Sequence, residues 1–270
     1  MKSFQKYISI HSEDRDLTKY PNAAKFAFEL PVEYKNVCSL RLSDIYLPPL
    51  YTFSESRNNL SFSIQRITEV KTITISPGNY TIDTLLTELK TAITKAYPTN
   101  SIEVLVDPIR NTIVFGSDII LTFLFFNRPI ASYLGFQQIN NNKSITITEY
   151  NEYSNHVTFI TPPAYVLEAP YPYNLQGDPF IYMELDLFNS MDELTPYTPH
   201  KSTAKHNLAF AKIPRLTYVS KELYLSNTFY SDPPLERIQK FQCKFRYHDG
   251  TLVDFGVSKF SFTIEILMLR

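Results

Sequence analysis

The 270-residue chain contains only 6 glycines, no tryptophan and 2 cysteines. No two glycines have the spacing of GxGxxG or GxSxG, and none precedes Lys-Ser or Lys-Thr, which excludes the common phosphate-binding loops and the nucleophile elbow. Cys38 and Cys243 are too few for a disulfide framework and form no CxxC pair, so we expect buried free thiols. The missing tryptophan weakens a carbohydrate-binding interpretation.

Histidines and paired carboxylates give little sign of a catalytic or metal site. None of the five histidines forms HExxH, and His200 and His206 lie in a proline-rich stretch. Glu184 and Asp186 are two residues apart on an expected strand, so both project from one face, as the carboxylates of a glycosidase could. A solvated sheet face explains them more simply. The sequence therefore predicts no catalytic residue, no metal and no cofactor.

The formal net charge is only −1, which argues against direct binding of nucleic acid. Residues 144–200 contain eight acidic side chains and no Lys or Arg, whereas residues 201–270 contain 11 Lys/Arg and 6 Asp/Glu. Two regions of opposite charge suit complementary packing against neighbouring proteins, or solvated faces within one monomer. The longest apolar run, residues 119–126, is too short to span a bilayer, so no transmembrane segment is expected.

Alternation of apolar and polar residues dominates the two ends of the chain and predicts strands with one buried face. The clearest examples are residues 240–247 and 260–266, and residues 181–187 place Leu187 on the buried face with Met183 and Leu185. Further strands are expected at residues 4–10, 25–30, 37–47 and 208–213. Residues 161–179 and 188–206 contain several prolines, and we expect irregular, exposed connections there.

The middle of the chain has a different pattern. Apolar residues from Ile82 to Ala96 recur at helical spacing, with Thr81 as the expected N-cap and Pro98 as the stop. Strands are expected around residues 70–75, 102–106, 112–115, 120–126 and 145–148. A short helix at residues 129–134 should end at Gly135, which suits the left-handed C-cap.

We therefore predict a mainly β protein, a jelly-roll-type antiparallel β-sandwich with an inserted small α+β unit. Residues 1–59 and 151–270 would form the sandwich together, because neither flank alone has enough strands to close one. Residues 60–150 would form the inserted domain.

Several side chains are candidates for contacts with other proteins. Tyrosine offers a rigid apolar ring with a polar tip and is enriched in interfaces. The tyrosines in proline-rich connections, and a charged segment before the first well-paired strands, are the predicted contact residues: Tyr165, Tyr171, Tyr173 and Tyr197, with Asp14, Arg15 and Asp16. Local loop packing is the alternative for the tyrosines, and a local turn tied by Asp14 and Arg15 is the alternative for the charged segment.

Short motifs in order along nearly the whole chain resemble those of capsid-associated proteins from nucleocytoplasmic large DNA viruses. These motifs are Ser12–Asp16, Tyr20-Pro21, Phe26–Pro31, Tyr34–Val37, Leu40–Pro48, Ile75–Tyr80, Tyr133–Phe136, Phe210–Ile213 and Asp249–Phe255. The resemblance implies a jelly-roll virion protein without enzymatic activity, of the minor capsid or penton type.

The resemblance also implies partners and a location. The partners would be other capsid proteins, including the major capsid protein, and further copies of the chain in a homo-oligomer. The location would be the virion capsid, assembled in the host cytoplasm. Two other functions stay open at this point: a glycan-binding jelly-roll module on a virion surface, and a polysaccharide-active enzyme that uses Glu184.

Overall fold

The computed structural model describes residues 2–125, 128–136, 145–146, 156–161, 163–194, 206–216, 218–220, 225 and 228–269. It divides into two compact units, and the second is inserted into the first. Unit 1 consists of residues 1–50 and 178–270, and unit 2 of residues 51–177. None of the described helices is long and apolar enough to cross a membrane.

Unit 1 is built on one antiparallel sheet with the strand order β1-β16-β2-β15-β10-β13, to which β14 adds by pairing with β2. The elements are β1 (Ser3–His11), the 3-10 helix η1 (Ser12–Asp14), β2 (Lys25–Tyr46), β10 (Phe180–Leu185), β13 (Ala211–Pro214), β14 (Tyr218–Ser220), β15 (Thr228–Arg246) and β16 (Ser261–Leu269). A separate hairpin pairs β11 (Met191–Leu194) with β12 (His206–Ala209).

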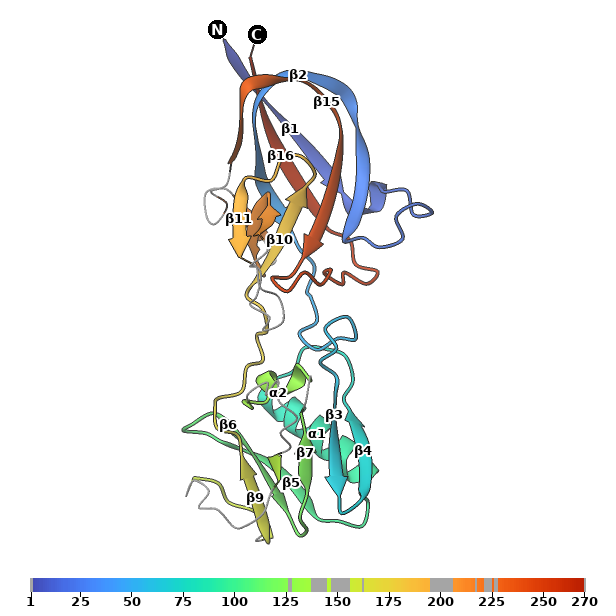
Figure 1. Cartoon of the computed structure of the whole chain (residues 1–270), viewed down its shortest axis with the longest axis vertical. Helices are drawn as coiled ribbons and strands as arrows, with labels where there is room; N and C mark the ends of the chain where they lie inside the picture. Colours follow the sequence, from blue (N-terminus) through green and yellow to red (C-terminus); the bar gives the residue numbers. More distant parts are fainter. Residues whose placement is uncertain are drawn as a thin grey trace. The chain divides into compact units, whose positions relative to one another are not determined.

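The sheet of unit 1 curls because its two longest strands bend over at one end (Figure 1). The register between β2 and β15 shifts between Tyr230 and Leu235 and again between Ile238 and Lys240, and such bulges bend a strand. The curl encloses a single apolar core, which contains Phe26, Phe245 and Phe262 in full burial. The predicted mainly β fold with an inserted α+β unit is therefore confirmed.

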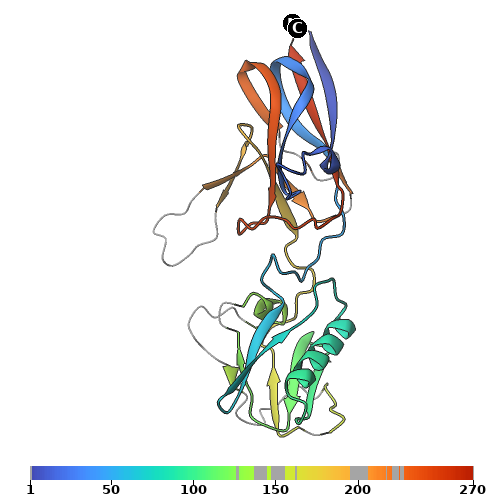
Figure 2. The ribbon, with the colours of Figure 1, turned by 90° about the vertical axis from the view of Figure 1, so that its right-hand side faces the viewer.

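Unit 2 packs a helix and two small sheets around its own core. One sheet has the order β4-β3-β7-β8 and the other β5-β6-β9. The elements are β3 (Ser61–Arg66), β4 (Glu69–Thr74), α1 (Ile82–Ala96), β5 (Ile102–Asp107), β6 (Thr112–Ser117), β7 (Thr122–Leu124), α2 (Ile130–Tyr133), β8 (Ile145–Thr146) and β9 (Tyr165–Glu168). Helix α1 packs against β4 and β5 (Figure 2).

The helix begins as the sequence predicts. The Thr81 hydroxyl accepts a hydrogen bond from the backbone N–H of Thr84, and the Thr84 hydroxyl accepts one from the backbone N–H of Thr81, which completes a capping box. Gly135 follows α2 with φ +85°, in the left-handed region expected of a C-cap glycine.

The units begin and end at residues other than those expected from the sequence. Residues 51–59 and 151–177 belong to unit 2. Phe53 is fully buried in the core of unit 2 and pairs its backbone with Gly78. Strand β9 pairs with β6, so the proline-rich segment 161–179 is not irregular throughout.

Two further expectations about strands were wrong. Strand β10 ends at Leu185, and Leu187 has φ +69° and is 83% exposed, so it does not continue the buried face. The stretch 188–206 was expected to be an exposed loop, but β11 forms within it and Glu193 on that strand is buried. The charge contacts of Glu193 explain its burial.

Candidate functional site: a buried charge network and an outer tyrosine face

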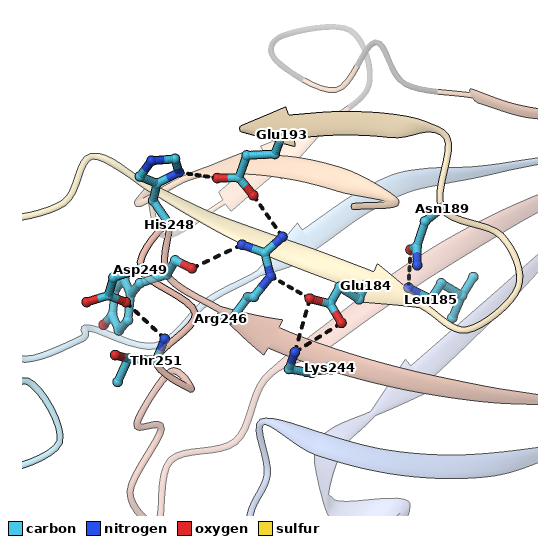
Figure 3. Close-up of polar contacts among 10 residues, drawn as sticks. Glu184, Leu185, Asn189, Glu193, Lys244, Arg246, His248, Asp249 and Thr251 are labelled. Atoms are coloured by element: carbon cyan, nitrogen blue, oxygen red, sulfur yellow. Dashed lines mark hydrogen bonds and ion pairs between the residues drawn. The ribbon is translucent and has the colours of Figure 1, made fainter. Parts of the chain in front are cut away.

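The charge network begins with cross-strand pairs on the outer side of β10 and β15. Glu184 lies opposite Lys244, and Tyr182 lies opposite Arg246. Lys244 Nζ lies 3.1 Å from both carboxylate oxygens of Glu184, and Arg246 Nε donates to Oε1 of the same carboxylate (Figure 3). Two cations therefore hold Glu184, and this pairing joins β10 to β15.

A second carboxylate reaches Arg246 from the β11–β12 hairpin. Arg246 Nη2 lies 2.8 Å from Glu193 Oε2, and Glu193 Oε1 contacts Nδ1 of His248 (Figure 3). Arg246 Nη1 donates to the backbone carbonyl of Tyr247. The Arg246 side chain is 1% exposed and that of Glu193 is 7% exposed. The network therefore joins the hairpin to the sheet through charged groups that are almost inaccessible to solvent.

Tyr182 closes one side of the network. Its ring lies beneath the Arg246 guanidinium, 5.1 Å from centroid to Cζ. Burial, and then the negative charge of Glu193, raises the pKa of the Tyr182 hydroxyl above its usual value. The phenol is therefore neutral and can donate a hydrogen bond to Glu193.

The network bears on two expectations from the sequence. Glu184 and Glu193 come from the acidic region and Lys244 and Arg246 from the basic region, so at these residues the opposite charges meet within one unit. Asp186 lies beyond the end of β10, is exposed, and donates its backbone N–H to the carbonyl of Gln242. The geometry of Glu184 is that of a structural ion pair.

The charged segment at Asp14–Asp16 forms a turn that is tied to its own surroundings. Arg15 donates to the backbone carbonyls of Ser12 and Tyr20, and one Asp16 oxygen accepts from the hydroxyl and backbone N–H of Thr18. The hydrogen bond from the Thr18 hydroxyl is the main cause that lowers the pKa of Asp16. Asp14 is exposed. Their role as contact residues stays a prediction.

The structure separates the four candidate tyrosines. Tyr165 and Tyr173 are half-buried and pack against the core of unit 2, whereas Tyr171 is 50% exposed. Tyr197 lies outside the described residues. Their role in contacts also stays a prediction, but of the three described tyrosines only Tyr171 is classed as exposed.

The two thiols show little sign of reactive chemistry. Burial raises the pKa of Cys243 to about 12, and its Sγ lies 3.5 Å from the carbonyl oxygen of Phe26. Cys38 is half-buried, and neither thiol is in a disulfide. Within the described part of the chain, no group of three or more His, Cys, Asp or Glu side chains is placed to hold a metal ion.

A different set of tyrosines lies on the outer face of the sheet of unit 1. The register of β16 with its neighbours defines that face, because residues directly opposite one another project to the same side. On β16, Ser261, Glu265 and Leu267 project to this side. Tyr7 lies opposite Glu265, and Tyr46 lies opposite both Ser261 and Tyr218. Tyr230 lies opposite Ser39, which pairs with Leu267 on its other side. We call Tyr7, Tyr46, Tyr218 and Tyr230 the tyrosine face.

The residues between the rings of the tyrosine face are buried or partly buried, and the charged ones among them are paired with each other. The four tyrosines are 53%, 52%, 54% and 76% exposed, in order along the chain. Between them, Ser39, Ser220 and Glu265 are each less than 9% exposed, and Arg41 Nη2 lies 2.8 Å from Glu265 Oε2. Rigid amphipathic rings over small or neutralised side chains form a surface of the composition that protein interfaces favour.

The sequence contains a signal for these tyrosines that our prediction did not use. Tyr7 alternates with the buried Ile8 and Ile10, and Tyr46 follows the buried Ile45. An aromatic residue in the polar phase of an alternating strand points away from the core. Aromatic residues at the solvent-facing positions of an alternating strand therefore predicted the exposed face better than tyrosines in proline-rich connections did.

No family model matches the sequence, and no curated protein matches it either. Among solved structures, the fold is similar to the penton protein of mavirus, with 9% sequence identity and a TM-score of 0.48 over 100% of both chains. It is also similar to a chain of the Sputnik virophage, with 11% identity and a TM-score of 0.40 over 98% of both chains. By these comparisons the chain is similar to a viral penton protein and to a virophage chain.

Proposed function

We propose that the chain is a non-enzymatic structural component of a large icosahedral DNA-virus capsid, of the minor capsid or penton type. It acts through protein–protein contacts in the virion. Its partners are other capsid proteins, including the major capsid protein, and it is assembled into particles in the host cytoplasm. It requires no cofactor.

The observation that carries this proposal is the tyrosine face. Four tyrosines, each at least half-exposed, project from one side of the sheet. Because a tyrosine ring has few rotatable bonds, it can bury a large area against a partner protein with little loss of side-chain entropy. The Arg41–Glu265 pair between the rings already satisfies its own charges, so a partner can cover it without leaving a bare ion. The motifs quoted from the sequence supply the viral context.

The test uses virions that incorporate variant chains. Tyr46→Thr and Tyr218→Thr together remove two neighbouring rings but keep β-branched residues suited to a strand. Quantitative mass spectrometry of purified virions should find the wild-type chain at a fixed ratio to the major capsid protein and the double variant at a reduced ratio. Leu187→Ser, at an exposed loop position of the same unit, is the control and should leave the ratio unchanged.

Two results would contradict the proposal. One is a double variant that folds normally and enters virions at the wild-type ratio. The other is a soluble monomeric chain that binds defined glycans on an array and loses that binding with the two tyrosines, which would favour a glycan-binding module.

A further inference from the structure

The two edge strands of the sheet of unit 1 differ in length and in their ability to pair with a further strand. At one edge, β13 has only four residues and ends at Pro214, which has no N–H to offer to a further strand. At the other edge, β1 has nine residues, pairs with β16 in a register without a bulge, and contains no proline. Among the described strands, only β16 pairs with β1 (Figure 2).

The register identifies which backbone groups of β1 face outward. Ser12 donates its N–H to the carbonyl of Phe260, in line with the register that pairs His11 with Ser261. Hydrogen-bonded and non-hydrogen-bonded pairs alternate along antiparallel strands. Ile8 and Ile10 therefore bond to β16, whereas Gln5 and Ser9 direct their N–H and C=O groups to the outer edge.

The side chains of β1 indicate what kind of strand fits there. The strand and the residue before it contain Lys2 and Lys6 but no Asp or Glu, and the described ion pairs involve neither lysine. Phe4 is 36% exposed on the inner side of the same edge. A second copy of β1 would bring like charges together, whereas an acidic strand would neutralise them.

We propose that the outer edge of β1 accepts an extended segment of another protein chain, one that alternates acidic or hydroxyl side chains with apolar ones. The segment adds a strand to the sheet through main-chain hydrogen bonds at Gln5 and Ser9. Lys2, Phe4 and Lys6 project from the same side of β1, so carboxylates of the segment pair with the two lysines and an intervening hydroxyl side chain lies beside Phe4. The apolar side chains of the segment project from the opposite side of the sheet. This edge borders the tyrosine face at Tyr7, but the inference rests on the backbone groups and lysines of β1 and not on the proposed capsid function.

The test uses the full chain and a defined probe, the fluorescein-labelled peptide acetyl-TEVTVEVTE-amide. Ser9→Pro removes an outward N–H while the bonds to β16 remain, and Ser9→Ala is the control that keeps the N–H. Fluorescence anisotropy should show binding to the wild type and to Ser9→Ala, and binding at least tenfold weaker to Ser9→Pro. A peptide with lysine in place of each glutamate should also bind at least tenfold more weakly.

Amide hydrogen exchange on the wild-type chain tests the same point without a variant, so a poorly folded Ser9→Pro protein does not block the experiment. The Gln5 and Ser9 amides should exchange rapidly in the isolated chain and slowly with the peptide, while the Ile8 amide is slow in both. No binding to the wild type, equal binding to Ser9→Pro, or unchanged exchange at Ser9 would overturn the inference. So would a dimer of the wild-type chain that Ser9→Pro abolishes, because β1 would then pair with itself.

Discussion

Arg246 and Glu193 form an almost completely buried ion pair, with 2.8 Å between Nη2 and Oε2, that joins the β11–β12 hairpin to the main sheet. The two residues are far apart in the sequence: Glu193 lies on β11 of the separate hairpin, and Arg246 lies at the end of β15 in the main sheet. A buried ion pair is a weak source of net stability, yet loss of one partner leaves the other charge without compensation.

Glu193→Gln should lower the free energy of unfolding by about 1–3 kcal/mol, because Arg246 keeps Glu184 but loses its second carboxylate. Asp192→Asn, at the exposed neighbouring position on the same strand, should change it by less than about 0.5 kcal/mol. Urea denaturation of the two variants and the wild type measures both values. Equal stability of the two variants would show that the Glu193 contact does not hold the hairpin.

Two glycines with nearly the same backbone conformation should respond differently to alanine. Gly135 has φ +85°, and a Cβ there would lie 2.0 Å from the backbone oxygen of Tyr171, whereas Gly250 has φ +87° and open space around it. Gly250→Ala should cost about 1–2 kcal/mol from backbone strain alone. Gly135→Ala should cost clearly more, because the segment at Tyr171 must move. Thermal unfolding of both variants tests this, and similar losses would contradict the close approach.

The stability of the chain should depend on Cys243 at alkaline pH. Its folded-state pKa of about 12 is above the usual value of 9.0, so the unfolded chain releases the thiol proton first as the pH rises. The contribution of the neutral buried thiol is therefore complete below pH 9 and is lost between pH 9 and 12. The wild type should lose stability in that range more steeply than Cys243→Val.

The comparison with Cys243→Val isolates the thiol, because raised pKa values of Tyr97 and Tyr182 act in the same direction in both proteins. Unfolding free energies from urea titrations at several pH values provide the measurement. Parallel pH profiles for the two proteins would mean that the thiol is not shielded from water.

The local elements were the part of the fold that the sequence predicted well. The helix after Thr81 and the strand at β16 were recognisable because capping and alternation are encoded within a few residues. Strand β2 was expected as two pieces, because the pattern is interrupted around Pro31, but tertiary pairing with β15 makes it continuous. Leu187 was misplaced because alternation alone does not mark where a strand ends.

The site depended on contacts that no local pattern encodes. Glu193 was assigned to an exposed loop, because nothing near it in the sequence indicates that Arg246 and His248 will lie against it. The tyrosine face required the register of β16 with its neighbours, which places Tyr7 and Tyr46 on one side. Composition alone could not distinguish these tyrosines from Tyr165 and Tyr173, which pack against the core of unit 2.

The tyrosine face should matter more for assembly than for folding. Replacement of both Tyr46 and Tyr218 by threonine should reduce the unfolding free energy by no more than about 1 kcal/mol, because their rings are half-exposed and form one cross-strand pair. Urea denaturation of the isolated double variant checks this value. A loss of several kcal/mol would mean that the two rings are needed for the fold itself, and reduced entry into virions would then have a trivial cause.

The most direct test of the structural role is a cryo-EM reconstruction of the virion at side-chain resolution. We expect density for this chain at fixed positions in the shell, with the rings of Tyr46 and Tyr218 buried against another capsid protein. A shell that lacks the chain, or a shell in which the tyrosine face is open to solvent at every position, would contradict it.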